Sequence, residues 1–217
     1  MPFRNRADAG RRLAAALAAY KNEQPVVLAL PRGGVPVAAE VAAALHAPLD
    51  LVLVRKLGVP GQPELAMGAV VDGSAPIIVR NEDVIRLTGV TDEEIQAVCA
   101  EELAEIERRR DRYLGKRVRV EPDSRVVIVV DDGIATGATT RAALRALRLR
   151  GPKKLVLAVP VAPTETLAAM RDEADEVVCL EDYADFGAIG FFYSDFRQTS
   201  DTEVIAALAQ FPPPAVK

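Results

Sequence analysis

Hydrophobic residues in this chain gather into short, uninterrupted runs. The run at 126–130, Val-Val-Ile-Val-Val, has no polar residue in alternate positions. Such a strand is buried on both faces, as in a parallel sheet, because a strand with one face in water alternates apolar and polar residues. Comparable strands are predicted at 26–30, 51–54, 155–159 and 176–180.

Helical patterns separate these strands. Apolar residues three or four positions apart predict helices at 7–20, 35–45, 140–150 and 164–173. Strands that alternate with helices are typical of βαβ units. The chain is therefore predicted to be an α/β protein, with an open parallel sheet of about five strands flanked by helices.

One segment interrupts the alternation with glycine and proline. Residues 56–80 are predicted to form a long flexible loop, with short strands near 68–71 and 76–79. A loop of this length inside a compact domain is usually a lid or a binding element.

A second segment, at 91–114, has the pattern of a long charged helix. Thr91 and Glu94 form a capping-box pair at its start. The arginines at 108–110 are expected on its solvated face, although a ligand site is the other interpretation.

Composition excludes several classes of protein. The chain has 217 residues and a formal net charge of −4, which argues against a general nucleic-acid binder. No apolar run approaches the ~20 residues that a membrane span needs. The two cysteines, Cys99 and Cys179, are far apart and are expected to be reduced. Together with the lack of an apolar leader, these features predict a cytoplasmic protein without membrane or nucleic-acid partners.

The most informative motif follows the run at 126–130. Asp131 and Asp132 end the strand, and a loop of small and hydroxyl residues leads into the next helix. Backbone N–H groups at a helix start lack internal partners, so this loop is a cradle for a phosphate group. No Lys-Ser/Thr pair follows the glycines, which excludes a Walker loop. Carboxylates beside a phosphate cradle suit ribose hydroxyls or hydrated Mg²⁺, so the motif indicates a phosphorylated ribose.

This motif resembles the signature of type I phosphoribosyltransferases, which bind phosphoribosyl pyrophosphate (PRPP). The resemblance implies the fold of that family: an open parallel sheet, a small hood and a long flexible loop. It places ribose and Mg²⁺ at Asp131 and Asp132, with the metal held largely through water and substrate. The remaining PRPP-binding positions that it implies here are Gly133, Ile134, Ala135, Thr136, Gly137, Ala138 and Thr139.

A second cradle ends the first predicted strand, in Pro31-Arg32-Gly33-Gly34. Its glycine N–H groups and guanidinium suit an anion, and ligands of parallel sheets lie beyond the carboxyl ends of the strands. Arg32 and Asp131 are therefore expected to converge on one ligand. The family resemblance identifies Arg32, Gly33 and Gly34 with the pyrophosphate loop, and implies a cis peptide at Pro31–Arg32.

The second predicted strand ends in Arg55 and Lys56. A bare Arg-Lys pair is usually a surface pair. The resemblance instead places these cations beside the leaving pyrophosphate and makes them catalytic, with the flexible catalytic loop just after them. Glu64 is a further candidate that would meet substrate when this loop closes.

Aromatic residues are concentrated at 183–198. They form either a hydrophobic patch that closes the sheet edge or a stacking surface for a base, the role of the hood in this family. The candidates for stacking are Phe186, Phe191, Phe192 and Tyr193. The chain is expected to be one domain over 1–217, with a core at 7–180, a helical insertion at 81–115 and a hood at 181–205.

The resemblance implies a Mg²⁺-dependent enzyme in which a nitrogen nucleophile displaces pyrophosphate from PRPP. The expected catalytic residues are Asp131, Asp132, Arg55 and Lys56, and the expected acceptor is a nucleobase of nucleotide salvage. No particular base is named, because 72–122 matches no base-specific enzyme and the cradle lacks the acidic residue of many purine enzymes. A PRPP-sensing regulator on the same fold remains the alternative, and a homodimer is one expectation for the assembly. A PRPP synthetase is disfavoured because there is no room for its second domain.

Overall fold

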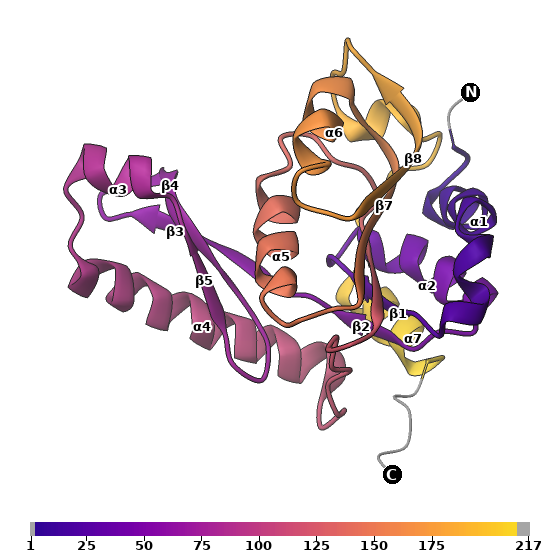
Figure 1. Ribbon diagram of the computed structural model, residues 1–217, viewed down its shortest axis with the longest axis horizontal. Helices are drawn as coiled ribbons and strands as arrows, with labels where there is room; N and C mark the ends of the chain where they lie inside the picture. The colour runs from indigo at the N-terminus through magenta and orange to yellow at the C-terminus, as the bar shows by residue number, and fades with distance from the viewer. Residues whose placement is uncertain (1–2, 212–217) are drawn as a thin grey trace.

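Five parallel strands form the central sheet. The structure, a computed structural model, describes residues 3–211. The strand order is β2-β1-β6-β7-β8 (Figure 1). The strands are β1 (Val26–Ala29), β2 (Leu49–Leu51), β6 (Val126–Val130), β7 (Lys154–Pro163) and β8 (Glu176–Tyr183). The predicted α/β fold with a parallel sheet of five strands is confirmed.

Helices cover both faces of this sheet. One face carries α1 (Arg6–Ala16), α2 (Gly34–Leu45) and α7 (Asp201–Ala209), and the other carries α5 (Ala138–Arg148) and α6 (Thr164–Met170). Successive residues of β6 point to opposite faces, as pleating requires. Ile128 and Val130 belong to the first face, and Val127 and Val129 to the second.

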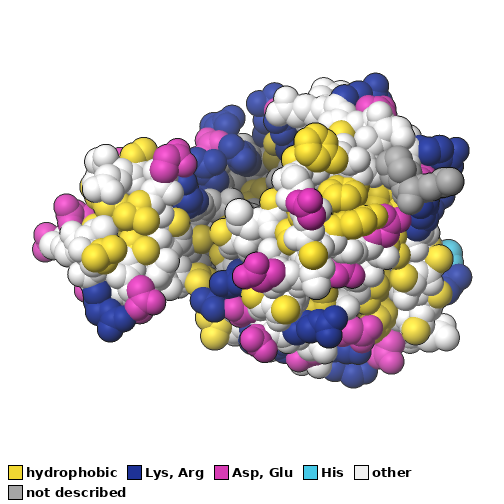
Figure 2. Space-filling model, turned by 90° about the horizontal axis from the view of Figure 1, so that it is seen from above, with side chains coloured by type: hydrophobic (Ala, Val, Ile, Leu, Met, Phe, Trp, Pro, Cys, Tyr) yellow, Lys and Arg dark blue, Asp and Glu magenta, His cyan; other side chains and the backbone are white. Residues whose placement is uncertain are grey.

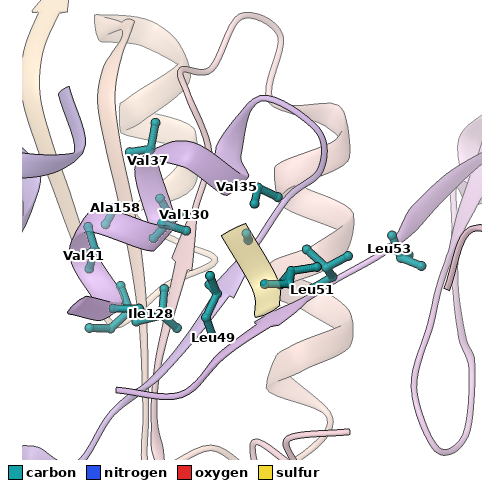
Figure 3. Packing of buried hydrophobic residues seen from close by; sticks show 14 of the residues in the cluster. Val35, Val37, Val41, Leu49, Leu51, Leu53, Ile128, Val130 and Ala158 are labelled. Carbon is teal, nitrogen blue, oxygen red and sulfur yellow. The ribbon is translucent and has the colours of Figure 1, made fainter. Parts of the chain in front are cut away.

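The first of these faces shows the packing in detail. Val37 and Val41 of α2 lie against Ile128 and Val130 of β6 (Figure 3), and all four are fully buried. Burying such a side chain stabilises the fold by roughly 1.5–3 kcal/mol. Each uninterrupted aliphatic strand therefore packs against helices on both faces of the sheet.

The second predicted strand, 51–54, is wrong in its boundaries. Strand β2 ends at Leu51, and a different strand begins at Val54. Leu51 and Leu53 are both buried, so one apolar run supplies the end of one strand and the approach to another. The chain leaves the central sheet between them.

The strand that begins at Val54 belongs to a separate antiparallel sheet. It contains β3 (Val54–Val59), β4 (Gln62–Val71) and β5 (Ile77–Arg80), in the order β3-β4-β5. With α3 (Glu82–Thr88) and α4 (Asp92–Leu114) it forms a projection that we call the arm, residues 54–114, which extends away from the central sheet (Figure 1).

The arm corrects the predicted loop at 56–80. A β-hairpin replaces most of it, and only the short strands near 68–71 and 76–79 were foreseen. Alternating apolar residues form the buried side of the hairpin, namely Leu57, Val59, Leu65 and Met67. Intervening glycines and prolines hid this period-two pattern, because Gly58 lies at a register shift and Pro63 lies at the start of β4.

Helix α4 confirms the helix predicted at 91–114. Thr91 and Glu94 make the reciprocal capping-box hydrogen bonds. Its apolar stripe packs on the hairpin, while Arg108 and Arg109 pair with Glu105 on the exposed side. Its length is 23 residues, yet no helix within 3–211 is long and apolar enough to cross a membrane.

Arg110 does not follow the predicted solvated face. It is 6% exposed and its Nη1 donates to Asp72 Oδ2 at 2.9 Å. Asp72, at the end of β4, also accepts from Arg119 Nη1 at 2.8 Å and from the backbone N–H of Leu53 at 2.8 Å. One buried carboxylate therefore joins the arm, through β4 and α4, to the segment that leaves β2 and to the segment that leads into β6.

Loss of the Asp72 charge should loosen this junction. Asp72→Asn keeps the shape of the side chain but leaves Arg110 buried without its strongest counter-charge, which typically costs about 3 kcal/mol or more. We expect a reduction of that size in the free energy of unfolding, measured with urea.

Glu107→Gln is the matched control, because Glu107 is exposed and touches the same network only through Arg119 at 3.4 Å. Its cost should stay below about 1 kcal/mol. Equal losses from both variants would contradict a special role for Asp72.

Candidate functional site

The two predicted cradles lie side by side at the carboxyl ends of β1 and β6. These strands pair in parallel, with Ala29 opposite Val130. The N–H of Leu30 donates to the carbonyl of Val130 at 2.9 Å, so pairing continues to the last residue before each loop. The segments at 31–34 and 131–137 therefore leave the same edge of the sheet together.

Close backbone approach explains the glycines of the cradle at 31–34. A Cβ atom on Gly33 would lie 2.0 Å from Oδ2 of Asp132, and one on Gly34 would lie 2.9 Å from Cα of Asp131. No side chain fits in either place. The peptide between Pro31 and Arg32 is cis, as the family resemblance implied.

The two acidic residues occupy different environments. Asp132 is 8% exposed, and its Oδ2 accepts a hydrogen bond from Arg6 Nε at 2.7 Å. Asp131 remains partly exposed, and its Oδ1 accepts from the backbone N–H of Asp132 at 2.8 Å. Burial of the carboxyl group, together with the negative charge of Asp132, raises the pKa of Asp131 well above its usual value. Of the two acids, Asp131 is therefore the one that keeps part of its residue surface exposed and has no ion pair among residues 3–211.

Hydrogen bonds from β7 and α6 hold the cradle that follows β6 in place. Ile134 is buried and its N–H donates to the carbonyl of Val161 at 3.0 Å, while Thr166 Oγ1 donates to the carbonyl of Ala135 at 3.0 Å. Within residues 3–211, no acceptor lies within hydrogen-bond distance of the backbone N–H groups of 135–139. Thr136 and Thr139 are exposed. Free donors at the start of α5 match the predicted phosphate cradle.

Gly137 is the N-cap residue of α5, and its backbone has a left-handed conformation that favours glycine. Its φ is +74°, and a Cβ atom there would lie 2.7 Å from Cε of Met170. A bulky residue at this position would strain the backbone and displace α6. Gly137 therefore lets the loop turn into α5 while α6 packs closely against it.

Arg32 is held away from the acids by an element that the sequence did not predict. Its guanidinium lies 3.6 Å from Asp201, the first residue of α7. The same carboxylate accepts from Tyr113 Oη at 2.7 Å and lies 2.8 Å from Arg112. The segment 201–205, expected in the hood, thus belongs to a helix that packs on α2 and α4.

Arg55 and Lys56 do not act as neighbours, contrary to the prediction. Both lie inside β3, not at the end of a parallel strand, so their side chains point to opposite faces of the arm sheet. Arg55 Nε is 2.5 Å from Glu102 of α4. Lys56 faces the other way, where its Nζ is 3.3 Å from Glu64.

Lys56 lines a cleft of about 440 Å³ between the arm and α5. Thr139 of the phosphate cradle lines the same cleft, and so do Arg80 of the arm and Arg141 of α5. Figure 2 shows the arm and the main body as separate lobes, with Lys and Arg side chains gathered around the hollow between them. Of the two predicted cations, only Lys56 therefore shares a cleft with the cradle.

The aromatic segment separates into exposed and buried residues. Phe191 is 77% exposed, and Phe192 is stacked between Tyr183 and Phe186 at centroid distances of 4.7 and 4.8 Å. Tyr193 was predicted to stack on a base, but it is 6% exposed. Its hydroxyl donates to the carbonyl of Asp132 at 2.6 Å, so burial gives it a structural contact in place of a free ring face.

The metal-binding capacity of the site is modest. Within 3–211, no group of three or more His, Cys, Asp or Glu residues is arranged to hold a metal ion. Two adjacent carboxylates fit Mg²⁺ all the same, because this ion keeps several waters and takes one or two carboxylates alongside substrate phosphates. Asp131 is the available donor, since Asp132 is paired with Arg6.

Sequence reasoning missed Arg6 and Asp201, which contact the predicted site residues from distant parts of the chain. Each lies at the first position of a helix, where a charged residue is commonplace. Asp201 follows Ser200, which forms a capping box with Glu203, so the start of α7 could have been read from the sequence. No local pattern marked Arg6.

Comparison with known proteins places the chain in a family. A family model described as the phosphoribosyl transferase domain matches residues 3–196. A curated protein of Mycobacterium tuberculosis (strain CDC 1551 / Oshkosh) with the provisional name phosphoribosyl transferase is 50% identical over 206 residues. The match covers 95% of this chain and 46% of that protein, so the chain spans about half the length of the curated relatives it matches.

A solved structure supports the same assignment. The crystal structure of TT1426 from Thermus thermophilus has a TM-score of 0.86 and 42% sequence identity to this chain. The similarity covers 98% of this chain and 100% of that one, so it includes the arm as well as the central sheet. With the family model and the relatives, it confirms the resemblance that the motifs indicated: the chain belongs to the phosphoribosyl transferase family, an enzyme class of the glycosyltransferase type.

Proposed function

We propose that the protein transfers the phosphoribosyl group of PRPP, with Mg²⁺, to a nitrogen nucleophile and releases pyrophosphate. The observation that carries this proposal is the contact between the two cradles. Gly33 packs directly on the carboxylate of Asp132 and Gly34 lies against Asp131, so an anion site and the acid proposed to bind ribose lie at adjacent strand ends. A ligand with a phosphate at each end of a ribose suits that arrangement.

The proposal assigns each part of PRPP to a group of residues. The 5′-phosphate binds the N–H groups of 135–139 and the hydroxyls of Thr136 and Thr139. Asp131 accepts hydrogen bonds from the ribose hydroxyls. The pyrophosphate binds at 32–34, where the N–H groups of Arg32 and Gly33 have no acceptor among the described residues. Mg²⁺, when bound, neutralises phosphate charge and would be held by Asp131, substrate oxygens and water.

The charges that develop on ribose and pyrophosphate during the reaction account for the proposed roles of Asp131 and Lys56. Departure of pyrophosphate leaves positive charge on the ribose ring and adds negative charge to the leaving group. A carboxylate at Asp131 stabilises the first, and a cation that moves in with the arm stabilises the second. Lys56 fits this role because only the exposed Glu64 holds it, whereas Arg55 is bound to Glu102 on the opposite face.

The acceptor is proposed to be a nucleobase or another small nitrogenous compound. Phe191 supports this choice, because its ring is exposed beside the stack formed by Phe192. A screen of nucleobases and small amines with PRPP and Mg²⁺, followed by pyrophosphate release, tests the proposal directly. Release that depends on one acceptor would support it, and no acceptor-dependent release across the screen would contradict it.

Asp131→Asn should weaken PRPP binding while the fold is kept. At about 100 times its Kd, a ligand stabilises the folded state by about 2.7 kcal/mol. We expect PRPP with Mg²⁺ to raise the melting temperature of the wild-type protein, and the variant to lose most of this rise. Asp172→Asn is the control, because Asp172 is exposed beyond the end of α6. A variant stabilised as strongly as wild type would remove Asp131 from the site.

Lys56→Gln should lower turnover more than PRPP affinity. The charge of Lys56 matters most when pyrophosphate departs, so we expect kcat to fall about tenfold or more with little change in the Kd of PRPP. Lys116→Gln, at an exposed lysine beyond the end of α4, should leave both unchanged. Steady-state kinetics and calorimetry give the two quantities. A normal kcat would exclude Lys56 from the chemical step.

A further inference from the structure

The first described residues form part of the site through the aromatic segment. The N–H of Phe3 donates to the carbonyl of Phe192 at 2.7 Å, and the N–H of Ser194 donates to the carbonyl of Phe3 at 2.8 Å. Phe3 is fully buried, with its ring 5.4 Å from that of Tyr193. Phe3 is thus paired like a strand residue with 192–194, and α1 begins a few residues later, where the Asn5 side chain caps it by accepting from the N–H of Asp8.

Arg6, the first residue of α1, extends from this pairing to Asp132. Its Nε donates to Asp132 Oδ2 at 2.7 Å and its Nη1 donates to the carbonyl of Arg197 at 2.7 Å. Its guanidinium carbon lies 4.0 Å from the centre of the Phe196 ring. Both charged side chains of the pair are 11% exposed. The guanidinium of Arg6 is planar and is held by these three contacts, so it has little freedom to rotate.

Asp132 is enclosed on its remaining sides. Gly33 lies against its carboxylate, and Tyr193 donates to its carbonyl oxygen at 2.6 Å. A carboxylate in such a place needs a counter-charge, because burial without one favours its neutral form or a turn toward solvent. Arg6 is the cation that contacts it within the described residues.

We propose that Arg6 is a positioning residue for PRPP binding. It keeps the Asp132 carboxylate against Gly33, and this contact sets the spacing between the pyrophosphate cradle and the ribose-binding acid. The argument rests on the proposed function, since PRPP is the ligand whose two ends need that spacing. Arg6 acts through Asp132 and is not assigned a contact with the ligand.

Direct binding of Mg²⁺-PRPP, measured by calorimetry, tests the inference without an acceptor. Because Arg6→Met removes the charged hydrogen bond that holds the Asp132 carboxylate, it should weaken binding by about tenfold or more. Arg6→Lys retains the charge but not the fork, and should recover part of the affinity. Arg11→Met is the matched control on the same helix, because Arg11 is half exposed and pairs with Glu40 of α2. It should bind as wild type does.

A double-mutant cycle separates positioning from general destabilisation. If Arg6 acts through Asp132, then Arg6→Met should weaken binding far less in an Asp132→Asn background than in wild type. Equal losses in both backgrounds would overturn the proposal, as would unchanged affinity in folded Arg6→Met. Circular dichroism confirms folding, and if Arg6→Met does not fold, Arg6→Lys decides by the same cycle. Wild-type protein that fails to bind Mg²⁺-PRPP would instead refute the proposed function.

Discussion

A single buried carboxylate, that of Asp72, determines how the two parts of this molecule are joined. It accepts from Arg110 of α4, from Arg119 before β6 and from the backbone of Leu53 after β2. Charges are costly to bury unless every one is paired, so this cluster strongly restricts alternative placements of the arm. Arg150, just beyond the end of α5, also donates to the backbone carbonyl of Asp72, so this residue contacts the segment that follows α5 as well as the arm. Lys56 can therefore lie near the phosphate cradle although no central strand carries it.

The geometry of the site depends on two positions that have no side chain. Gly33 and Gly34 have no side chains, so two loops from adjacent parallel strands can touch. That contact separates the roles of the paired acids. Asp132 faces inward and is fixed by protein groups, while Asp131 stays accessible. Adjacent acids in a motif can thus occupy different environments, and the difference follows from which neighbour each side chain meets.

Sequence patterns predicted the structure where residues close together in the chain determine it. Aliphatic runs indicated the parallel sheet because residues such as Val127 and Ile128 are buried on opposite faces. Asp131, Gly133 and the threonines indicated the cradle because a helix start binds anions through its own backbone. Prediction failed where distant segments decide the outcome. Tyr193 was expected to present a free ring face, but it packs against Phe3, and Arg55 was expected at the end of a parallel strand but lies inside β3 and pairs with Glu102 of α4.

Helix α4 has a mechanical property that follows from where it is held. It runs from Asp92 near the arm tip to Tyr113, which contacts the Asp201 carboxylate beside Arg32. Arg110 fixes it near that second end. At 1.5 Å per residue, the outer portion is about 27 Å long and the inner portion about 4.5 Å. The helix is thus one continuous element that runs from the arm tip to the residues beside Arg32, so the position of the arm tip and the Tyr113–Asp201–Arg32 contacts are linked through its backbone.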